Sequence, residues 1–454
     1  MEKNQVPWLE RISYGLSDTG FNLMFTMMST YLLYFYTDVF GVAAALIAPV
    51  FLAGRIIDGF TDPFEGILMD RVHTRWGRSR PFWLWFSIPW AILAVLVFSA
   101  PDLPDSGKIV YIYITYLAFN AALSLVSLPI SAILPSLTSN TQERTVINVV
   151  RMVFNVLGNL IVVAVTLSLV QALGGSNLRQ GYLLTAILFS SIAVLLFMNA
   201  FARTHERVRP VEGKPVPVKT ALKSVLNLPW FLLMALVIIV NLSLTIKNMS
   251  TIYYMEYNLN RPDLTSAMLT VPNLVLLVAI VLSPFISKRM GKRNASLLGV
   301  GIGIAGSAVV VFSGDNIPLL FGGTMLTFLG LGLPAGLLGA MFADTVDYIE
   351  WKTGVRSQGL IYSASSIGIK IGQGLGGALG AGLLALGNYV PNVTQAASSL
   401  AAIQFSFDWV ILISLVLLEI LLVFYNVDRL YPQITSGLEE RRSRAAAPGL
   451  VPVE

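Results

Sequence analysis

Two carboxylates stand one helical turn apart inside a long apolar stretch, in Arg55-Ile-Ile-Asp-Gly-Phe-Thr-Asp-Pro63. The spacing puts Arg55, Asp58 and Asp62 on one face of a helix. Two acids this close make an oxygen-rich, doubly negative site that can bind a hard monovalent cation such as Na+ or share a proton. Thr61 can add an oxygen, and Pro63 removes a helical hydrogen bond beside the pair. The alternative is that Arg55 neutralises Asp58 in a structural ion pair, which leaves Asp62 unbalanced.

Further polar side chains interrupt other apolar stretches. Lys370 stands among glycines three residues before Gln373, and a buried lysine needs a counter-charge or a sugar hydroxyl. Lys247 has hydroxyl and amide neighbours, so it can hold an anionic group on a substrate or neutralise a nearby acid. Arg151 and Asn22 each share a helical face with another polar residue, which either lines a wet cavity or joins helices.

An acidic run ends one of the later apolar stretches, in Asp344-Thr-Val-Asp-Tyr-Ile-Glu350, and basic residues follow it. We expect salt bridges between helices that hold one gate of the molecule closed. The residues assigned to such a gate are Arg55, Arg75, Arg78, Asp344, Asp347, Glu350 and Arg356.

The amino-acid composition indicates the environment in which these charged and polar side chains lie. The 454 residues are 55% hydrophobic and only 12% charged, with a mean hydropathy of +0.72, whereas soluble domains carry about 25% charged residues. The sequence has no cysteine, its two histidines are not spaced as metal ligands, and it has no phosphate-binding loop. We therefore expect an all-α polytopic membrane protein that is not an enzyme and has no cofactor, catalytic residue or nucleic-acid partner.

The segments that must position the charged groups are stretches of about 20 apolar residues, the length that crosses a bilayer. Such stretches are helices, because backbone groups in lipid need internal partners. Twelve are predicted, at 13–37, 45–69, 82–100, 109–136, 148–173, 180–201, 227–255, 266–287, 295–313, 318–345, 358–387 and 403–427.

The loops between these stretches set the topology. Lysine and arginine concentrate after the second, fourth, sixth, eighth and tenth stretches, which places both termini in the cytoplasm. A charged segment rich in proline separates the sixth stretch from the seventh, and its composition is typical of a linker. The predicted parts are a six-helix bundle at 1–202, a cytoplasmic linker at 203–224, a second bundle at 225–430 and a tail at 431–454.

A weak repeat supports this division into halves. Arg75-Trp-Gly-Arg-Ser-Arg follows the second stretch, and Arg289-Met-Gly-Lys-Arg follows the eighth. A parallel duplication of six helices is typical of transporters that rock two bundles around a substrate near the midplane.

The chain resembles the glycoside-pentoside-hexuronide:cation symporter family, melibiose permease-like, within the major facilitator superfamily, over roughly residues 10 to 430. The motifs that carry the resemblance are Ser13-Tyr-Gly15, Tyr36-Thr-Asp38, Asp58-x-x-x-Asp62-Pro63, Asp70-Arg71, Thr74-Arg-Trp-Gly-Arg-Ser-Arg-Pro81, Ala343-Asp-Thr-Val-Asp-Tyr348, Trp351-Lys-Thr-Gly-Val-Arg356 and Gly387-Asn-Tyr-Val-Pro391.

The resemblance implies symport of a sugar or glycoside with a proton or a sodium ion by alternating access. In the melibiose permease branch the acids matching Asp58 and Asp62 form the cation site, with Thr61 and the hydroxyl of Ser124 nearby. The lysine matching Lys370 links the cation and sugar sites. The residues assigned to the sugar-binding site are Asn22, Ser127, Ser131, Arg151, Lys247, Lys370 and Gln373.

This chain departs from that branch at three sugar-site positions. Asn22 replaces an aspartate, and Ser127 and Ser131 replace an aspartate and a tryptophan. With Lys247 present, the loss of acids favours a hexuronide or another anionic sugar, and the rival is a neutral pentoside or xyloside. The loss of the aspartate that Ser127 replaces also favours protons over sodium as the coupling ion.

Two other classes of function compete with sugar symport. A lipid or lysolipid carrier can share the fold, but the polar character of Asn22, Ser127 and Arg151 favours a sugar. A sensor that binds without transporting gives the pair Asp58 and Asp62 no purpose. We expect a functional monomer in the lipid bilayer of the bacterial cytoplasmic (inner) membrane, with a small-molecule sugar as its partner.

Overall fold

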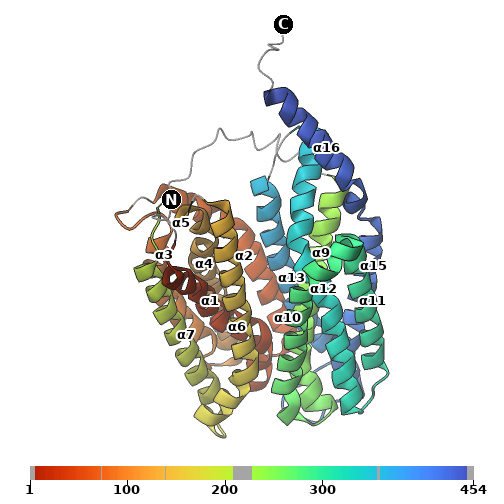
Figure 1. Cartoon of the computed structure of the whole chain (residues 1–454). Helices are drawn as coiled ribbons and strands as arrows, with labels where there is room; N and C mark the ends of the chain where they lie inside the picture. Colours follow the sequence, from red (N-terminus) through yellow and green to blue (C-terminus); the bar gives the residue numbers. More distant parts are fainter. Residues whose placement is uncertain (1–5, 73, 139, 208–226, 355–357, 447–454) are drawn as a thin grey trace. The chain divides into compact units, whose positions relative to one another are not determined.

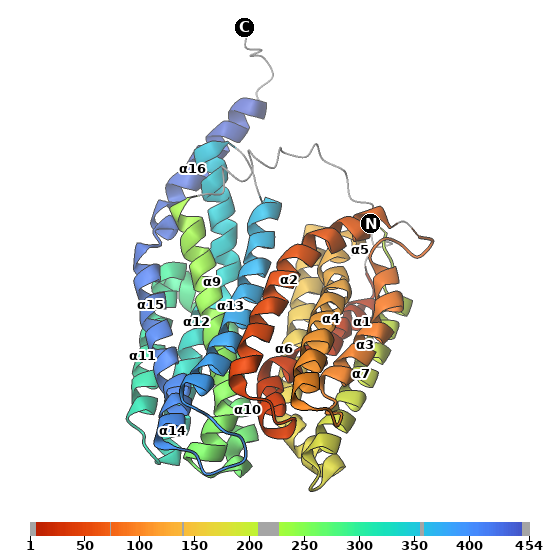
Figure 2. The same ribbon diagram turned by 180° about the vertical axis from the view of Figure 1, so that it is seen from behind.

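The computed structural model describes residues 6–72, 74–138, 140–207, 227–354 and 358–446, and nearly all of them are helical (Figures 1 and 2). The long helices are α1 (Trp8–Tyr34), α2 (Ala44–Arg71), α3 (Arg80–Val97), α4 (Asp105–Ala132), α6 (Thr141–Gly174), α7 (Leu178–Arg203), α9 (Leu228–Tyr253), α10 (Thr265–Met290), α11 (Lys292–Val311), α12 (Ile317–Thr353), α13 (Gln358–Leu386), α15 (Val410–Phe424) and α16 (Val427–Ala446). The short segments are η1 (Phe35–Val39), α5 (Leu134–Leu137), η2 (Tyr254–Asn258), η3 (Pro262–Leu264), α14 (Ala397–Gln404) and η4 (Phe405–Trp409).

Each of the twelve apolar stretches predicted from the sequence is helical over most of its length. Within the described ranges, 10 helical segments are long and apolar enough to cross a membrane. The first two stretches, in α1 and α2, are not among them. The first contains many polar residues, such as Ser17, Asp18 and Asn22, and the second has side chains outside the described residues.

The structure extends the prediction at the end of α12 and in the C-terminal tail. The helix α12 has 37 residues, about 55 Å at 1.5 Å per residue, so it is longer than the hydrocarbon layer is thick. The sequence predicted no helix in the tail, but α16 lies there and packs on α12. The indole of Trp351 lies close to Gly437, because a Cβ added at Gly437 would lie 2.5 Å from Trp351 Nε1.

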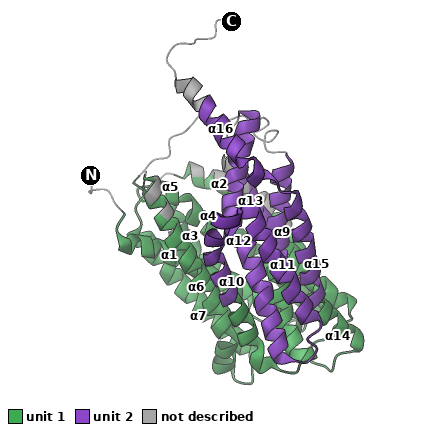
Figure 3. Ribbon diagram, turned by 45° about the vertical axis from the view of Figure 1, so that its right-hand side comes forward, with its two compact units in different colours: residues 1–211, 244–273, 373–407 green, residues 212–243, 274–372, 408–454 purple. Residues whose placement is uncertain are grey.

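The chain divides into two compact units, coloured in Figure 3. Unit 1 contains Met1–Val211, Leu244–Asn273 and Gln373–Phe407, and unit 2 contains Glu212–Ser243, Leu274–Gly372 and Asp408–Glu454. Unit 1 therefore joins the first half of the chain to the ends of α9 and α13. The predicted linker 203–224 lies mostly outside the described residues, and the division into two six-helix halves stays a prediction.

In unit 1 a reciprocal clasp joins the start of α3 to the end of α7. The carboxylate of Glu206 accepts hydrogen bonds from the backbone N–H groups of Arg78, Ser79 and Arg80, at 2.9, 2.8 and 3.2 Å. In return Arg80 Nη2 donates to the carbonyl oxygen of Phe201 at 2.5 Å. Gly77 has φ +112°, and a Cβ there would lie 2.5 Å from the Glu206 carboxyl carbon. The clasp thus satisfies groups that helix ends leave unpaired.

Unit 2 contains the same clasp at the start of α11. The Asp428 carboxylate accepts from the backbone N–H of Arg293 at 2.7 Å, and Arg293 donates to the carbonyls of Leu422 and Val423 at 3.0 and 2.5 Å. Gly291, with φ +85°, matches Gly77. The two short motifs that looked repeated in the sequence therefore make the same contacts.

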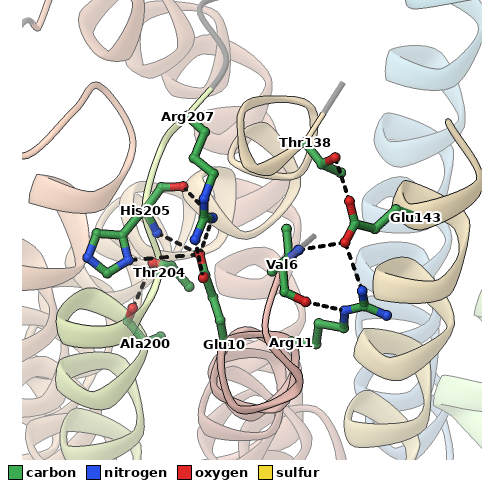
Figure 4. A network of polar contacts seen from close by, with 9 residues as sticks. All are labelled: Val6, Glu10, Arg11, Thr138, Glu143, Ala200, Thr204, His205 and Arg207. Carbon is green, nitrogen blue, oxygen red and sulfur yellow. Dashed lines mark hydrogen bonds and ion pairs between the residues drawn. The ribbon is translucent and has the colours of Figure 1, made fainter. Parts of the chain in front are cut away.

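A polar network joins Val6 and the start of α1 to the rest of unit 1 (Figure 4). Glu143 accepts from Arg11 Nη2 at 2.7 Å, from Thr138 Oγ1 at 2.6 Å and from the Val6 N–H at 2.6 Å. Burial raises the pKa of the Glu143 carboxyl, but these three donors outweigh burial and hold the pKa below its usual range. Nearby, Arg207 and Glu10 form a bidentate pair at 2.7 Å. The beginning of α1 is thereby held in place.

Close packing of α1 on α6 positions the polar groups in unit 1. A Cβ at Gly158 would lie 3.0 Å from Thr19 Cα, so only glycine allows this approach. Across the contact, Thr19 Oγ1 donates to the carbonyl of Phe154 at 2.8 Å, and Asn159 Nδ2 donates to Thr26 Oγ1 at 3.2 Å. Buried polar groups on α1 thus find partners on α6.

The clasps predict a stability effect. We expect Glu206→Ala and Asp428→Ala each to lower the melting temperature of the purified protein, because buried helix-end N–H groups lose a charged acceptor, at a cost of about 2 kcal/mol. The measurement is thermal unfolding in detergent. The control is Asp315→Asn, an exposed acid in the turn before α12. Melting temperatures equal to that of the control would contradict the role assigned to the clasps.

Candidate functional site

The predicted cation site lies on α2, whose backbone is helical as expected. The side chains of Arg55, Asp58 and Asp62 lie outside the described residues. The Thr61 side chain is described, and its hydroxyl oxygen is buried with no hydrogen-bond partner among the described protein atoms. Ser124, on α4, is buried as well. These placements leave the cation site a prediction, with one unsatisfied oxygen at Thr61.

Unit 1 contains a small cavity, which we call the α1 cavity. Its volume is about 30 Å³, enough for a few water molecules and far too small for a disaccharide. The lining residues are Phe25, Met28, Ser29 and Leu32 of α1, Phe51 of α2, Tyr116 of α4, Thr245 and Met249 of α9, and Gln373, Gly374 and Gly377 of α13. Five helices far apart in the sequence thus contribute to one lining.

The lining of the α1 cavity is apolar and aromatic with a few neutral polar groups. The rings of Phe51 and Tyr116 lie 5.3 Å apart between centroids and form an aromatic wall. Ser29, Thr245 and Gln373 supply hydroxyl and amide groups, and no charged side chain is among the described residues that line the cavity. Such a surface matches a neutral polyol, which presents both C–H faces and hydroxyls.

Of the predicted sugar-site residues, Gln373 lines the α1 cavity. The sequence interpretation missed Ser29, Tyr116 and Thr245. Ser29 was detectable, because it lies seven residues after Asn22, two helical turns along the same face. Tyr116 gave no comparable signal, since aromatic residues are common in membrane helices.

Asp18 is a further residue that the sequence interpretation missed. It is a buried acid on α1, four residues before Asn22 on the same face. Its carboxylate accepts from Asn155 Nδ2 at 3.1 Å and lies 3.7 Å from Arg151 Nε, both on α6. Arg151 Nε makes no hydrogen bond to the described protein atoms. Asn22 Nδ2 donates to the Asp18 carbonyl at 2.8 Å.

Lys247 has a different environment from the one that an anionic substrate requires. Its side chain is 3% exposed, its Nζ donates to the carbonyl of Phe407 at 3.0 Å, and it lies over the Phe407 ring. Thr245 and Met249 of the same helix line the α1 cavity. Residues two positions apart on a helix point about 200° apart, so Lys247 faces away from that cavity.

The remaining sugar-site residues are not among the described residues that line the α1 cavity. Ser127 donates to the carbonyl of Ser124 at 3.3 Å within α4, and Ser131 is exposed. Lys370, on α13, is partly exposed. Their assignment to the sugar site stays a prediction.

The gate residues have partners that the sequence did not identify. Asp344 of α12 is buried and accepts from Lys292 Nζ of α11 at 2.6 Å, and Tyr431 of α16 donates to Asp347 at 3.3 Å. Both contacts lie within unit 2. Glu350, also on α12, is half-buried.

The basic residues assigned to the gate are described only in part. The Arg75 guanidinium lies 4.5 Å from the Trp76 ring centroid, and the Arg78 backbone N–H takes part in the clasp with Glu206. Arg356 and the side chain of Arg55 lie outside the described residues. The gate itself therefore stays a prediction.

Comparison with known proteins extends over nearly the whole chain. Residues 13–429 match the model of the family described as MFS/sugar transport protein. The isoprimeverose transporter of Lactiplantibacillus pentosus is 41% identical, over 98% of this chain and 94% of its own length. The glucuronide carrier protein homolog of Escherichia coli (strain K12) is 30% identical, over 96% and 97% respectively.

A solved structure shows the same fold at low sequence identity. The crystal structure of the nucleoside transporter NupG superposes with a TM-score of 0.61 and 14% identity, over 91% of this chain and 99% of that chain. The helical architecture, the motifs of the sequence and these matches agree. The chain belongs to the MFS/sugar transport family, as a member of the glycoside-pentoside-hexuronide:cation symporters of the major facilitator superfamily.

Proposed function

We propose that this protein is a cation-coupled symporter that takes up a neutral glycoside containing a pentose, of the class to which isoprimeverose belongs. Isoprimeverose is a disaccharide of xylose and glucose. The observation that carries the proposal is the lining of the α1 cavity, which combines an aromatic wall with hydroxyl and amide groups and has no charged side chain among its described residues. The 41% identity to an isoprimeverose transporter supports the same class.

The neutral class is favoured over an anionic sugar. The anionic hypothesis depends on Lys247, whose Nζ contacts the carbonyl and the ring of Phe407 on the side of α9 away from the α1 cavity. The relative whose name states a glucuronide is also less similar, at 30% identity against 41%. A charged sugar in a neutral cavity would lose its hydration without gaining an ion pair.

In the proposed cycle the cation binds at Asp58 and Asp62, with Thr61 and Ser124 beside them. The unsatisfied hydroxyl oxygen of Thr61 supports this placement, since a bound cation would supply its missing partner. Neutralising the two acids lowers the free energy of moving the loaded site through a dry state. The absence of an aspartate at Ser127 favours a proton over sodium.

The sugar binds in an enlarged α1 cavity. Gln373, Ser29 and Thr245 bond its hydroxyls, and the rings of Phe51 and Tyr116 face its C–H surface. The charge of Arg151 is compensated by Asp18, and its Nε, which has no hydrogen-bond partner among the described atoms, supports a further contact to a sugar oxygen. With a volume of about 30 Å³, the cavity must open before sugar enters, as alternating access requires.

The lipid-carrier alternative is not favoured. The lining at Ser29, Thr245 and Gln373 is more polar than an acyl chain requires. We place the protein in the bacterial cytoplasmic membrane with both termini cytoplasmic, where it acts as a monomer. No catalysed reaction is assigned to it.

Reconstituted liposomes test the cargo. We expect isoprimeverose or a xyloside to accumulate against its gradient when a proton or sodium gradient is imposed, and a glucuronide to accumulate at least tenfold less. Each ion gradient is imposed alone, and radiolabelled uptake is measured. Preferential accumulation of the glucuronide would overturn the neutral class. Absence of flux for every sugar, followed by movement of lysolipid, would overturn sugar transport altogether.

Coupling is tested at Asp62. We expect Asp62→Asn to reduce the ratio of internal to external sugar to about one, because the cation site loses its charge, while exchange of sugar across the membrane at equilibrium continues. The matched control is Asp263→Asn, an acid in an exposed pair with Arg261. Accumulation driven by the ion gradient in the Asp62 variant would rule out the assigned cation site.

Specificity is tested at Gln373 and Lys247 together. We expect Gln373→Ala to raise KM for the neutral sugar about tenfold, the effect of one lost hydrogen bond in a closed site. We expect Lys247→Gln to leave the preference for neutral sugar over glucuronide unchanged, because its Nζ faces Phe407. If the Lys247 variant changes this preference and the Gln373 variant does not affect KM, the assigned lining is wrong.

A further inference from the structure

The last turn of the first helix contains a buried carboxylate that several uncharged donors share. Asp38 lies in η1 and is 7% exposed. Its Oδ1 accepts from Tyr389 Oη at 2.5 Å and also from the hydroxyl of Tyr257, and its Oδ2 accepts from Thr37 Oγ1 at 2.6 Å. Its backbone carbonyl accepts from Asn392 Nδ2 at 2.7 Å. All these residues belong to unit 1.

The donors come from segments that are far apart in the sequence. Asp38 ends the motif Tyr36-Thr-Asp38, and Tyr389 stands in Gly387-Asn-Tyr-Val-Pro391, which the sequence singled out separately. Tyr257 lies in η2, directly after α9. The turn that presents Tyr389 is held by two asparagines with positive φ, Asn388 at +54° and Asn392 at +59°, a conformation that asparagine tolerates.

This cluster lies at the end of α1, beyond the α1 cavity. Ser29 and Leu32 line that cavity, and the next residue, Leu33, lines a smaller apolar space of about 10 Å³ with Tyr253. The hydroxyls of Tyr253 and Thr37 then lie 2.8 Å apart. Along α1 the order is therefore cavity, apolar constriction and Asp38, and Asp38 is about 13 Å beyond Ser29 at 1.5 Å per residue.

The tyrosines also pack against one another across this end of the molecule. The ring of Tyr389 meets those of Tyr253 and Tyr257 edge to face, with centroids 5.4 and 5.5 Å apart. A carboxyl group that accepts hydrogen bonds from hydroxyls can exchange them for water when the segments separate. Such a contact can open and close, unlike an apolar seal of the same area.

We propose that Asp38, Tyr257 and Tyr389 form a latch that seals the α1 cavity at the end of α1, and that the latch must open in the transport cycle. The inference rests on the proposed function, because it supplies one of the two closures that alternating access needs. Tyr389 and Tyr257, from the second half of the chain, hold Asp38 of the first half in the closed state. By the predicted topology this end of α1 faces the outside of the cell.

Because the chain has no cysteine, a single introduced thiol reports on the latch without background. Ser250, which lines the small apolar space behind the latch, is replaced by cysteine. The rate of labelling with a membrane-impermeant maleimide is measured in right-side-out and inside-out vesicles. We expect Asp38→Asn and Tyr389→Phe each to raise the labelling rate about tenfold in one orientation of vesicle, because each removes a charge-assisted hydrogen bond of the latch.

Two further variants make the result interpretable. Asp263→Asn removes an exposed acid near η2, and we expect no change in labelling. Tyr257→Phe keeps the ring and removes one donor, so it replaces Asp38→Asn if that variant does not fold. Labelling rates equal to the control in every latch variant, or lower than the control, would overturn the proposal.

The experiment separates the latch from the cargo. Labelling needs no sugar, so a faster rate in the latch variants together with no uptake of any sugar would leave the latch standing and reject the proposed function. Sugar accumulation by the parent protein, together with unchanged labelling rates in the latch variants, would support the proposed function and reject the latch. Uptake is measured on the same vesicle preparations before the maleimide is added.

Discussion

A polar group in hydrocarbon is unstable unless another part of the chain supplies its partner, and this constraint shapes every element of the structure. Asp344 is buried against Lys292, and Asp18 is buried beside Arg151. Asp38 instead takes its donors from hydroxyls and an amide. Each pair fixes two helices or turns relative to each other, so the buried charges act as specific joints in a protein whose helices are otherwise held by apolar packing.

The same constraint explains the two clasps. Helix ends leave N–H and C=O groups without partners. An acid from a later segment accepts from N–H groups at the starts of α3 and α11, and an arginine donates to carbonyls at the ends of α7 and α15. Glu206 with Arg80 and Asp428 with Arg293 make these contacts in the two units. The short motif between the helices needs glycine because the carboxylate occupies the space of a side chain. This is a physical reason for a repeat that is only a few residues long.

The charged side chain of Lys247 makes its contacts elsewhere, and the described residues that line the α1 cavity are neutral. Lys247 is committed to Phe407 on the far side of α9, while Thr245 of the same helix reaches the cavity. A neutral lining selects by hydroxyl geometry and aromatic contact and excludes charged sugars through their hydration. The small volume of the cavity indicates that substrate binding and opening are linked, because residues from five helices must separate to admit a sugar.

The sequence by itself determined the membrane environment, the helical segments and the family, because apolar length, loop charge and local motifs are properties of contiguous residues. It also singled out Gln373, which lines the α1 cavity, while the role of Gln373 at the sugar stays a prediction. Only the tertiary structure decided which way each polar side chain points and what it meets: it turned Lys247 away from the cavity, paired Asp344 with Lys292 and brought Tyr389 to Asp38. Such pairings join residues tens or hundreds of positions apart, and no periodicity along one segment encodes them.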